Sequence, residues 1–454
     1  MSVSRSQLLN ASHGLPVSAE AFAEAMKPIA VGKRLAVAVS GGADSMALTL
    51  LASEWSQRTG VEVTALTVDH RLRDASTTEA AAVGTWMQSR GIAHTILNWR
   101  DGEAVRLLGR SAQDAARDAR LGLLTQWCRA NTCHTLLLAH HADDQVETFF
   151  MRLARGSGLN GLGGMDVVTS FNQVRLIRPL LAFSKSDLEE TCRAANQVWI
   201  DDPSNDSAKY TRTRFRRARA IMESEGFTRE RVLSTIAHLQ RAKAALSQFV
   251  SDLHAAACIW SLYGSVAISA SKLFAAPEDV SLRLLSDLLR SVGGQTYGPR
   301  FEALRRVHAK LQAQHVKTIT LHGCCISREG DSISLCREPS AVREAFELVQ
   351  SQPMIWDGRF EFTFRPELSG RQLLRVRPYD VADKIWWKDH GGWGALADIP
   401  SRIRRSLPVI EDQAGPIGMP HAGVWRADMT DIVTMRHLGP ERVSGGFSAQ
   451  TQGD

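Results

Sequence analysis

Between residues 33 and 155 the chain alternates short apolar runs with amphipathic stretches, and this pattern limits the fold more than any other feature. Each apolar run and the stretch after it together take about 30 residues. Strands alternating with helices of this length predict βαβ units, and therefore an α/β fold with a doubly wound parallel sheet. The expected strands are residues 35–39, 61–68, 93–99 and 135–139, and the expected helices are residues 46–58, 76–90, 111–130 and 143–155.

A glycine-rich turn follows the first expected strand. Two glycines at this point let several backbone N–H groups face one concavity, and the next helix adds the positive end of its dipole. The turn lacks the lysine of a P-loop and carries Asp44 instead, and a carboxylate beside phosphates requires Mg²⁺ between them. A simple capped strand-to-helix turn is the alternative interpretation. The candidate phosphate-binding residues are Ser40, Gly41, Gly42, Ala43, Asp44 and Ser45.

A second polar group follows the fourth expected strand and contains His140, Asp144 and Glu147. Asp144 and Glu147 are three residues apart, so they share one face of the first helical turn. Together with Asp44 they could complete a Mg²⁺ shell, because ligands gather at the carboxyl ends of parallel strands. Acidic residues are also ordinary dipole partners in a first turn, and a metal-dependent phosphohydrolase would show a similar group.

Residues 209–219 contain six basic side chains and no acidic one, with Tyr210 and Phe215 among them. Basic residues interleaved with aromatic ones suit a nucleic-acid backbone, although such a run can also be a solvated helix face. The net charge of +6 and the pI near 9.0 permit a polyanionic partner.

The remaining composition excludes several classes. No apolar run is long enough for a membrane helix, and the first residues lack a secretory pattern, which predicts a cytoplasmic protein with no membrane partner. The seven cysteines are scattered without a C-x-x-C pair, so neither a disulfide framework nor a zinc site is indicated. Changes in periodicity predict three domains: residues 1–217 with the parallel sheet, a helical domain at 218–340, and a small mixed α/β domain at 341–454.

These motifs together resemble one superfamily. Ser-Gly-Gly-x-Asp-Ser is the signature of the PP-loop, or N-type, ATP pyrophosphatases, which cleave ATP between the α and β phosphates to adenylate a substrate. Within it, the chain is similar to the tRNA(Ile)-lysidine synthetase family in "VDHRLRDAS", "AHHADDQVETFFMRLARGSGLNGLGGM", "IRPLL" and "DDPSNDSAKYTRTRFRR". The rival hypotheses are a PP-loop tRNA thiolase, which would need sulfur chemistry on cysteine, and a non-catalytic RNA-binding protein.

The resemblance implies that ATP adenylates the wobble cytidine of an isoleucine tRNA with a CAU anticodon, and that L-lysine then displaces AMP. It also implies tRNA acceptor-side recognition by the third domain and allows a homodimer. ATP and Mg²⁺ would be the cofactors, with the metal on Asp44 and Asp144. His140 and Glu147 would line the reacting centre, and Arg117, or else Arg120, would face the α-phosphate. The expected tRNA-binding residues are Arg212, Arg214, Arg216 and Arg217.

Overall fold

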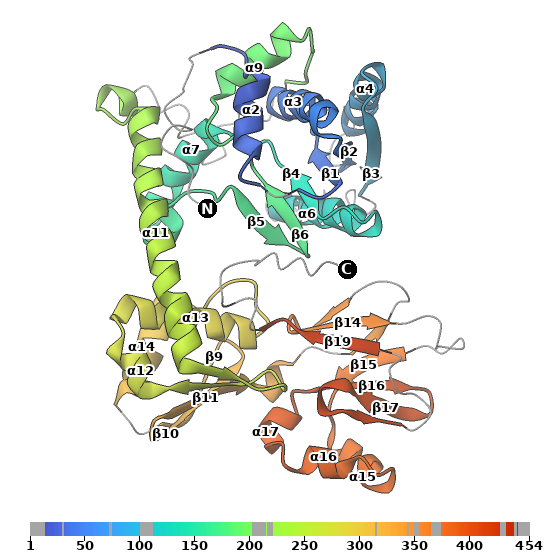
Figure 1. Ribbon diagram of the computed structural model, residues 1–454, viewed down its shortest axis with the longest axis vertical. Coiled ribbons are helices and arrows are strands. Elements are labelled where there is room, and N and C mark those ends of the chain that lie inside the picture. Colours follow the sequence, from blue (N-terminus) through green and yellow to red (C-terminus); the bar gives the residue numbers. More distant parts are fainter. Residues whose placement is uncertain are drawn as a thin grey trace. The chain divides into compact units, whose positions relative to one another are not determined.

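The computed structural model divides the chain into two compact units, Met1–Ala244 and Ala245–Asp454, drawn in Figure 1. Each unit has its own sheets and apolar cores, so each is described by itself. Among the described residues, no helix is both long and apolar enough to cross a membrane. The structure describes residues 14–29, 31–71, 75–99, 112–201, 215, 221–313, 316–342, 345–348, 354–364, 374–426, 433–439 and 443.

The first unit is built on a six-stranded sheet with strand order β3-β2-β1-β4-β6-β5. Every neighbouring pair is parallel except β5 and β6, which form an antiparallel hairpin at one edge. The expected parallel α/β sheet is therefore confirmed. The strands are β1 (Arg34–Ala38), β2 (Glu62–Asp69), β3 (Ala93–Asn98), β4 (Thr135–Leu137), β5 (Val168–Phe171) and β6 (Val174–Ile177).

Helices follow the parallel strands, as the alternating sequence predicts (Figure 1). The four expected helices are present, each with ends within a few residues of the predicted ones. The helices of this unit are α2 (Ala19–Met26), α3 (Ala43–Thr59), α4 (Ala75–Ser89), α6 (Ala112–Ala130), α7 (Ala142–Leu153), α8 (Leu159–Leu162) and α9 (Lys185–Ala194).

The alternation of side chains along β1 fills two cores on opposite faces of the sheet. Leu35 and Val37 are buried on one face, in a cluster that includes residues of α2, α3, α4 and α9. Ala36 is buried on the other face, in a cluster with residues of α6. Because both faces are covered, the carboxyl edge of the sheet is left for polar loops. Those loops carry the candidate site.

The second unit begins within the long helix α11 (Arg229–Ala257) and contains a five-stranded antiparallel sheet of order β7-β8-β11-β10-β9. The sequence predicts a helical domain here, and it does not predict these strands. Each strand of this sheet is at most six residues long, and Gly323 and Gly330 lie in two of the tight turns between strands. The alternation of apolar and polar residues that identifies a strand is therefore brief. The elements are β7 (Cys258–Trp260), β8 (Val266–Ser269), α12 (Ala270–Ala275), α13 (Glu278–Val292), α14 (Phe301–Gln312), β9 (Val316–Leu321), β10 (Cys324–Glu329) and β11 (Ser332–Arg337).

Beyond residue 345 the chain forms two more antiparallel sheets, of orders β12-β15-β16-β17-β18 and β13-β14-β19, with short helices between β15 and β16. Strands and helices thus occur together here, as expected of a mixed α/β region. The three-domain limits stay a prediction. The elements are β12 (Phe346–Leu348), β13 (Met354–Trp356), β14 (Phe360–Phe364), β15 (Leu374–Pro378), α15 (Val381–Asp389), α16 (Trp393–Ala397), α17 (Ser401–Arg404), β16 (Pro408–Asp412), β17 (Gly415–Met419), β18 (Val424–Trp425) and β19 (Val433–His437).

Candidate active site

The glycine-rich turn links β1 to α3 and leaves the first turn of that helix open. Gly42 is the N-cap residue, and no side chain caps the helix. The N–H groups of Ala43, Asp44 and Ser45 occupy the first three helical positions, where intrahelical acceptors are absent. Such N–H groups, together with the helix dipole, favour an anion. The turn can therefore hold a phosphate, as the sequence predicts.

Three hydrogen bonds fix the shape of this turn. The Ser45 Oγ accepts from the Ser40 backbone N–H at 3.1 Å and donates to the Gly42 carbonyl at 3.0 Å. Gly41 has a φ of +88°, and a Cβ on it would lie 2.6 Å from the Cδ1 of Ile200. The backbone N–H of Ile200 also donates to the Gly41 carbonyl at 2.9 Å. Only glycine suits this position, because both its backbone angle and its surroundings exclude a side chain.

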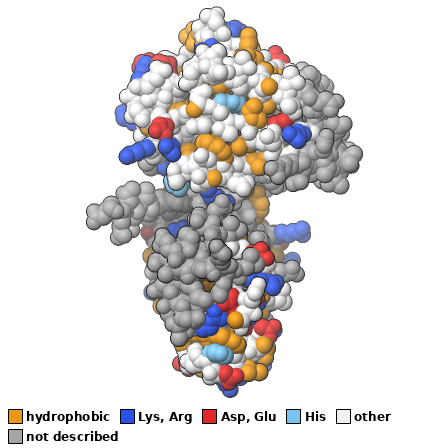
Figure 2. All heavy atoms as spheres, turned by 90° about the vertical axis from the view of Figure 1, so that its right-hand side faces the viewer, with side chains coloured by type: hydrophobic (Ala, Val, Ile, Leu, Met, Phe, Trp, Pro, Cys, Tyr) orange, Lys and Arg blue, Asp and Glu red, His pale blue; other side chains and the backbone are white. Residues whose placement is uncertain are grey.

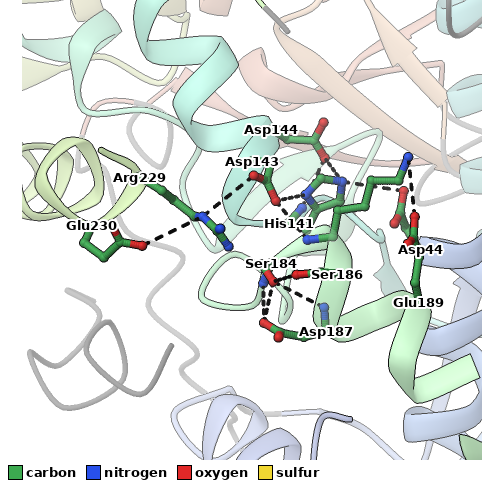
Figure 3. Close-up of polar contacts among 11 residues, drawn as sticks. Asp44, His141, Asp143, Asp144, Ser184, Ser186, Asp187, Glu189, Arg229 and Glu230 are labelled. Carbon is green, nitrogen blue, oxygen red and sulfur yellow. Dashed lines mark hydrogen bonds and ion pairs between the residues drawn. The ribbon is translucent and has the colours of Figure 1, made fainter. Parts of the chain in front are cut away.

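The second polar group lies at the start of α7, next to Asp44 (Figure 3). The side chain of His141 is 2% exposed, and its Nε2 lies 3.5 Å from Asp44 Oδ2 and 3.6 Å from Asp144 Oδ2. Its Nδ1 lies 3.7 Å from Asp143 Oδ2. The backbone N–H of His141 also donates to Asp144 Oδ2 at 3.1 Å. One imidazole therefore contacts carboxylates from the first turns of two helices.

The pKa of His141 reflects competition between burial and charge. Burial is the largest influence and by itself lowers the pKa. The hydrogen bond with Asp44 and the negative charges of Asp144, Asp44 and Asp143 outweigh it, and raise the pKa of His141 to about 9. With three carboxylates around one imidazole, the cluster keeps an excess of negative charge, as a cation-binding site requires.

Comparisons with known proteins agree with this geometry. A model of the PP-loop domain family matches residues 15–223. The tRNA(Ile)-lysidine synthase of Wolbachia sp. subsp. Brugia malayi (strain TRS) is 36% identical over 398 residues, which cover 86% of this chain and 89% of that protein. The synthase of Orientia tsutsugamushi (strain Boryong) is also 36% identical, over 401 residues, with the same two coverages. The chain belongs to the tRNA(Ile)-lysidine synthase family.

A third relative, the tRNA(Ile)-lysidine synthase of Ruegeria pomeroyi (strain ATCC 700808 / DSM 15171 / DSS-3), is 37% identical over 330 residues. That match covers 72% of this chain and 76% of the relative. Since the Wolbachia and Orientia matches reach 86% of this chain, the likeness to lysidine synthases extends well beyond the PP-loop domain. Membership of the lysidine synthase family therefore rests on both units.

The lysidine synthase motif that follows β4 also supplies Glu147 and His140. Glu147 is buried on the face of α7 that carries Asp144, three residues earlier. His140 is half-buried in the loop just before the helix. The structure thus brings Asp144, Glu147 and His140 together at one strand end, and it brings Asp44 to Asp144 through their shared contact with His141.

The carboxylates suit Mg²⁺, which commonly uses one or two carboxylates and completes its shell with phosphate oxygens and water. The buried Oδ1 of Asp44 has no hydrogen-bond partner among the described residues, so it is an oxygen still able to take a ligand. In the same part of the chain, no three His, Cys, Asp or Glu side chains form a complete metal cage. A metal shared with a nucleotide needs no such cage.

Asp69, at the end of β2, has a different task. Its carboxylate accepts from Ser76 Oγ at 2.7 Å, Thr77 Oγ1 at 2.8 Å and the Arg71 N–H at 3.2 Å. Burial raises its pKa, but these hydrogen bonds outweigh burial and lower the pKa below its usual value. Both carboxylate oxygens of Asp69 thus accept hydrogen bonds, and these bonds connect the loop after β2 to the start of α4.

Some predicted residues cannot be placed. Arg212, Arg214, Arg216 and Arg217 lie outside the described residues, as does the side chain of Arg117. Arg120 lies on α6 and is exposed. On the face drawn in Figure 2, described basic and acidic side chains are interspersed.

Sequence reasoning selected His140 and missed His141. The signal for His141 was its place directly before the acidic first turn, where an N-cap residue contacts the following side chains. Its place among three carboxylates depends on the approach of Asp44, from the first turn of α3, which the sequence around residue 141 does not reveal. His141 is the residue that joins the two predicted motifs.

Proposed function

We propose that this chain ligates lysine to C2 of the wobble cytidine in the CAU anticodon of an isoleucine tRNA. The reaction consumes ATP and releases pyrophosphate and then AMP. The observation that carries the proposal is the meeting of Asp44, from the PP-loop, with Asp144, from the family's second motif, at His141. This geometry and the relatives named tRNA(Ile)-lysidine synthase support the proposal.

In the first step the C2 oxygen of cytidine attacks the α-phosphate, and pyrophosphate leaves. The backbone N–H groups of residues 43–45 and the hydroxyls of Ser40 and Ser45 would cradle the departing phosphates. Asp44 and Asp144 would hold Mg²⁺, which when bound neutralises charge on the polyphosphate. Arg117, or Arg120, would stabilise negative charge that develops on the α-phosphate.

In the second step the lysine ε-amine attacks C2, the C2–O bond breaks and AMP leaves. Glu147 is the candidate to orient this amine and accept its proton, and His140 lines the same centre. A cavity beside Glu147 offers apolar walls for the lysine chain and carboxylates for its charge. It is lined by Asp143, Val146, Glu147, Phe150, Phe215, Met222, Glu223, Phe227 and Arg229.

The tRNA itself is a polyanion, and residues 209–219 remain the proposed contact with its backbone. The variant with both Arg214→Ala and Arg217→Ala should weaken tRNA binding and reduce its salt dependence, because fewer counterions are released. Affinity for ATP should be nearly unchanged. We place the reaction in the cytoplasm, and assign a homodimer only as an expectation from the family resemblance.

The test is nucleoside analysis of tRNA after incubation of the protein with ATP, Mg²⁺ and labelled lysine. We expect label on one cytidine, with AMP released only when tRNA is present. The matched control is the same tRNA with a GAU anticodon, which lacks the wobble cytidine. Incorporation into both tRNAs, or into neither while ATP is still hydrolysed, would contradict the proposal. A sulfur-containing nucleoside would instead indicate a thiolase.

A further inference from the structure

His141 sits between two carboxylates that repel one another. Asp44 belongs to the first turn of α3 and Asp144 to the first turn of α7, so they come from separate helices (Figure 3). Their Oδ2 atoms lie 3.5 Å and 3.6 Å from the same ring nitrogen, Nε2. Like charges brought this close separate unless a partner holds them. The imidazole is the group placed to do so.

Asp144 is held by His141 in two ways. Besides the ring contact, the backbone N–H of His141 donates to the same Oδ2 at 3.1 Å, as the N-cap residue of α7. Asp44 has only the ring contact on its Oδ2, while its buried Oδ1 has no hydrogen-bond partner in the described chain. Loss of the ring would therefore release Asp44 more than Asp144.

The ring is braced on its other side. Asp143 Oδ2 lies 3.7 Å from Nδ1 and also accepts from the backbone N–H of Lys185, the first residue of α9, at 2.8 Å. Asp143 Oδ1 lies 3.8 Å from the Nε of Arg229, at the start of α11. With 2% of its side chain exposed, His141 has little freedom to turn away from Asp44.

We propose that His141 is a positioning residue that holds the Asp44 carboxylate beside Asp144, so that the two can share one divalent cation bound with the nucleotide. This inference rests on the proposed function, and goes beyond it by assigning the geometry of the metal site to a residue that need not touch metal or substrate. The required feature is a hydrogen-bonding atom at the place of Nε2. Mutation of a residue that hydrogen-bonds to a metal ligand commonly lowers metal affinity by about 10- to 100-fold.

Two variants separate this role from simple packing. In His141→Gln the side-chain amide can reach the position of Nε2, whereas in His141→Asn it reaches only that of Nδ1. Both variants remove the ring. We therefore expect His141→Asn to raise the Mg²⁺ concentration needed for half-maximal ATP binding by about 10- to 100-fold, and His141→Gln to raise it by less than about 10-fold.

The measurement is calorimetric titration of ATP at several Mg²⁺ concentrations without tRNA or lysine, so that no turnover occurs. ATP binding without Mg²⁺ should be equal in His141→Asn and His141→Gln, because both lose the same imidazole charge and both keep the PP-loop N–H groups. Equal Mg²⁺ dependence in His141→Asn and the unchanged protein would overturn the proposal. Equal shifts of the Mg²⁺ dependence in both variants would also overturn it. So would a loss of metal-free ATP binding in His141→Asn as large as its loss of binding with Mg²⁺.

Folding and function are checked separately. Thermal unfolding without metal reports the packing cost of each variant, and if His141→Asn does not fold, His141→Gln and Asp143→Asn replace it. Asp143→Asn weakens the brace, so we expect it to raise the Mg²⁺ concentration needed for half-maximal ATP binding; no shift in Asp143→Asn would overturn the proposal. Failure of the proposed function would appear differently, as absence of lysine incorporation by the unchanged protein.

Discussion

Two groups of charged residues, one in each unit, differ in their exposure to solvent and in whether their carboxylate oxygens are already hydrogen-bonded. In the first unit, Asp44, Asp143 and Asp144 surround a single imidazole, and the Asp44 side chain is 33% exposed. In the second unit, Asp357 lies between the guanidinium groups of Arg337 and Arg359 (the arginine cluster), and none of these three side chains is more than 2% exposed.

Hydrogen bonding follows the same division. Asp357 Oδ2 accepts from Arg337 Nε at 2.8 Å and from Arg359 Nε at 2.7 Å, while Oδ1 accepts from Arg337 Nη2 at 2.7 Å. The guanidinium carbon of Arg359 also lies 4.8 Å from the centre of the Phe360 ring. Among the described residues, the buried atom without a partner is a carboxylate oxygen, Oδ1, in Asp44, whereas in the arginine cluster it is an N–H donor, Nη1 of Arg359.

The difference teaches how to separate a binding site from a structural ion cluster. The arginine cluster is closed to solvent and both oxygens of its carboxylate already accept hydrogen bonds, so it has no carboxylate oxygen left for a ligand. The cluster around His141 has excess negative charge, a partly exposed carboxylate and an oxygen free to bind. Burial of charge alone would have ranked the arginine cluster first.

The largest expected effect tests the carboxylates around His141. Asp44→Asn or Asp144→Asn should each reduce AMP release by at least about 100-fold, since the amide keeps the shape but loses the charge that holds Mg²⁺. AMP release and urea unfolding are measured together. Glu62→Gln, which removes an exposed carboxylate paired with Arg34, is the control and should leave turnover unchanged. Full turnover in either aspartate variant would refute the metal assignment.

The next largest effect tests the arginine cluster. Asp357→Asn leaves two buried guanidinium groups without their counter-charge, and should lower the free energy of unfolding of the second unit by about 3–5 kcal/mol. ATP affinity should not change. Asp279→Asn serves as the matched control, because Asp279 pairs with Arg283 at 58% exposure and should cost no more than about 0.5 kcal/mol. Similar losses in both variants would remove the distinction.

A third effect depends on pH, through His421. Burial, followed by the positive charges of Arg359 and His437, lowers the pKa of His421 from 6.5 to about 3. Below pH 6.5 His421 is therefore protonated in the unfolded chain but not in the folded chain, and the free energy of unfolding decreases as pH falls. Between pH 7 and pH 5 this histidine should contribute a loss of about 2 kcal/mol. His421→Leu should show a correspondingly shallower pH dependence in urea unfolding, and an unchanged slope would contradict this.

The smallest effect concerns three buried cysteines. Cys128, Cys133 and Cys192 are buried in the first unit, and the proposed nucleophile is lysine rather than sulfur. Replacing each with Ala should cost about 1 kcal/mol of stability and leave turnover per folded molecule intact. Lysine incorporation is normalised to the folded fraction. Loss of chemistry in a folded Cys128→Ala or Cys133→Ala protein would favour a thiolase.

The sequence predicts the parallel sheet well, because β1 to β4 lie within uninterrupted alternation of apolar runs and helices. It also predicts that Asp44 and Asp144 approach each other, since both follow parallel strands at one sheet edge. It does not identify His141, because the contact of that ring with Asp44 joins residues distant in sequence.

The second unit was harder to predict for related reasons. Its sheets consist of short antiparallel strands, whose alternation is too brief to distinguish from a loop. The arginine cluster depends on Asp357, which has a φ of +51° in a tight turn, and on Arg337, which reaches it from β11. Nothing in the local sequence at residue 337 identifies that partner.

The contact of Ile200 with Gly41 sets a lower limit on the length of a nucleotide-binding fragment. A chain shortened to end at residue 198 would retain every strand of the parallel sheet and both Asp44 and Asp144. It would nevertheless lose the N–H group that donates to the Gly41 carbonyl and the side chain that covers this glycine. Dissection of the protein by its secondary structure alone would thus yield a folded sheet with a loosened phosphate loop.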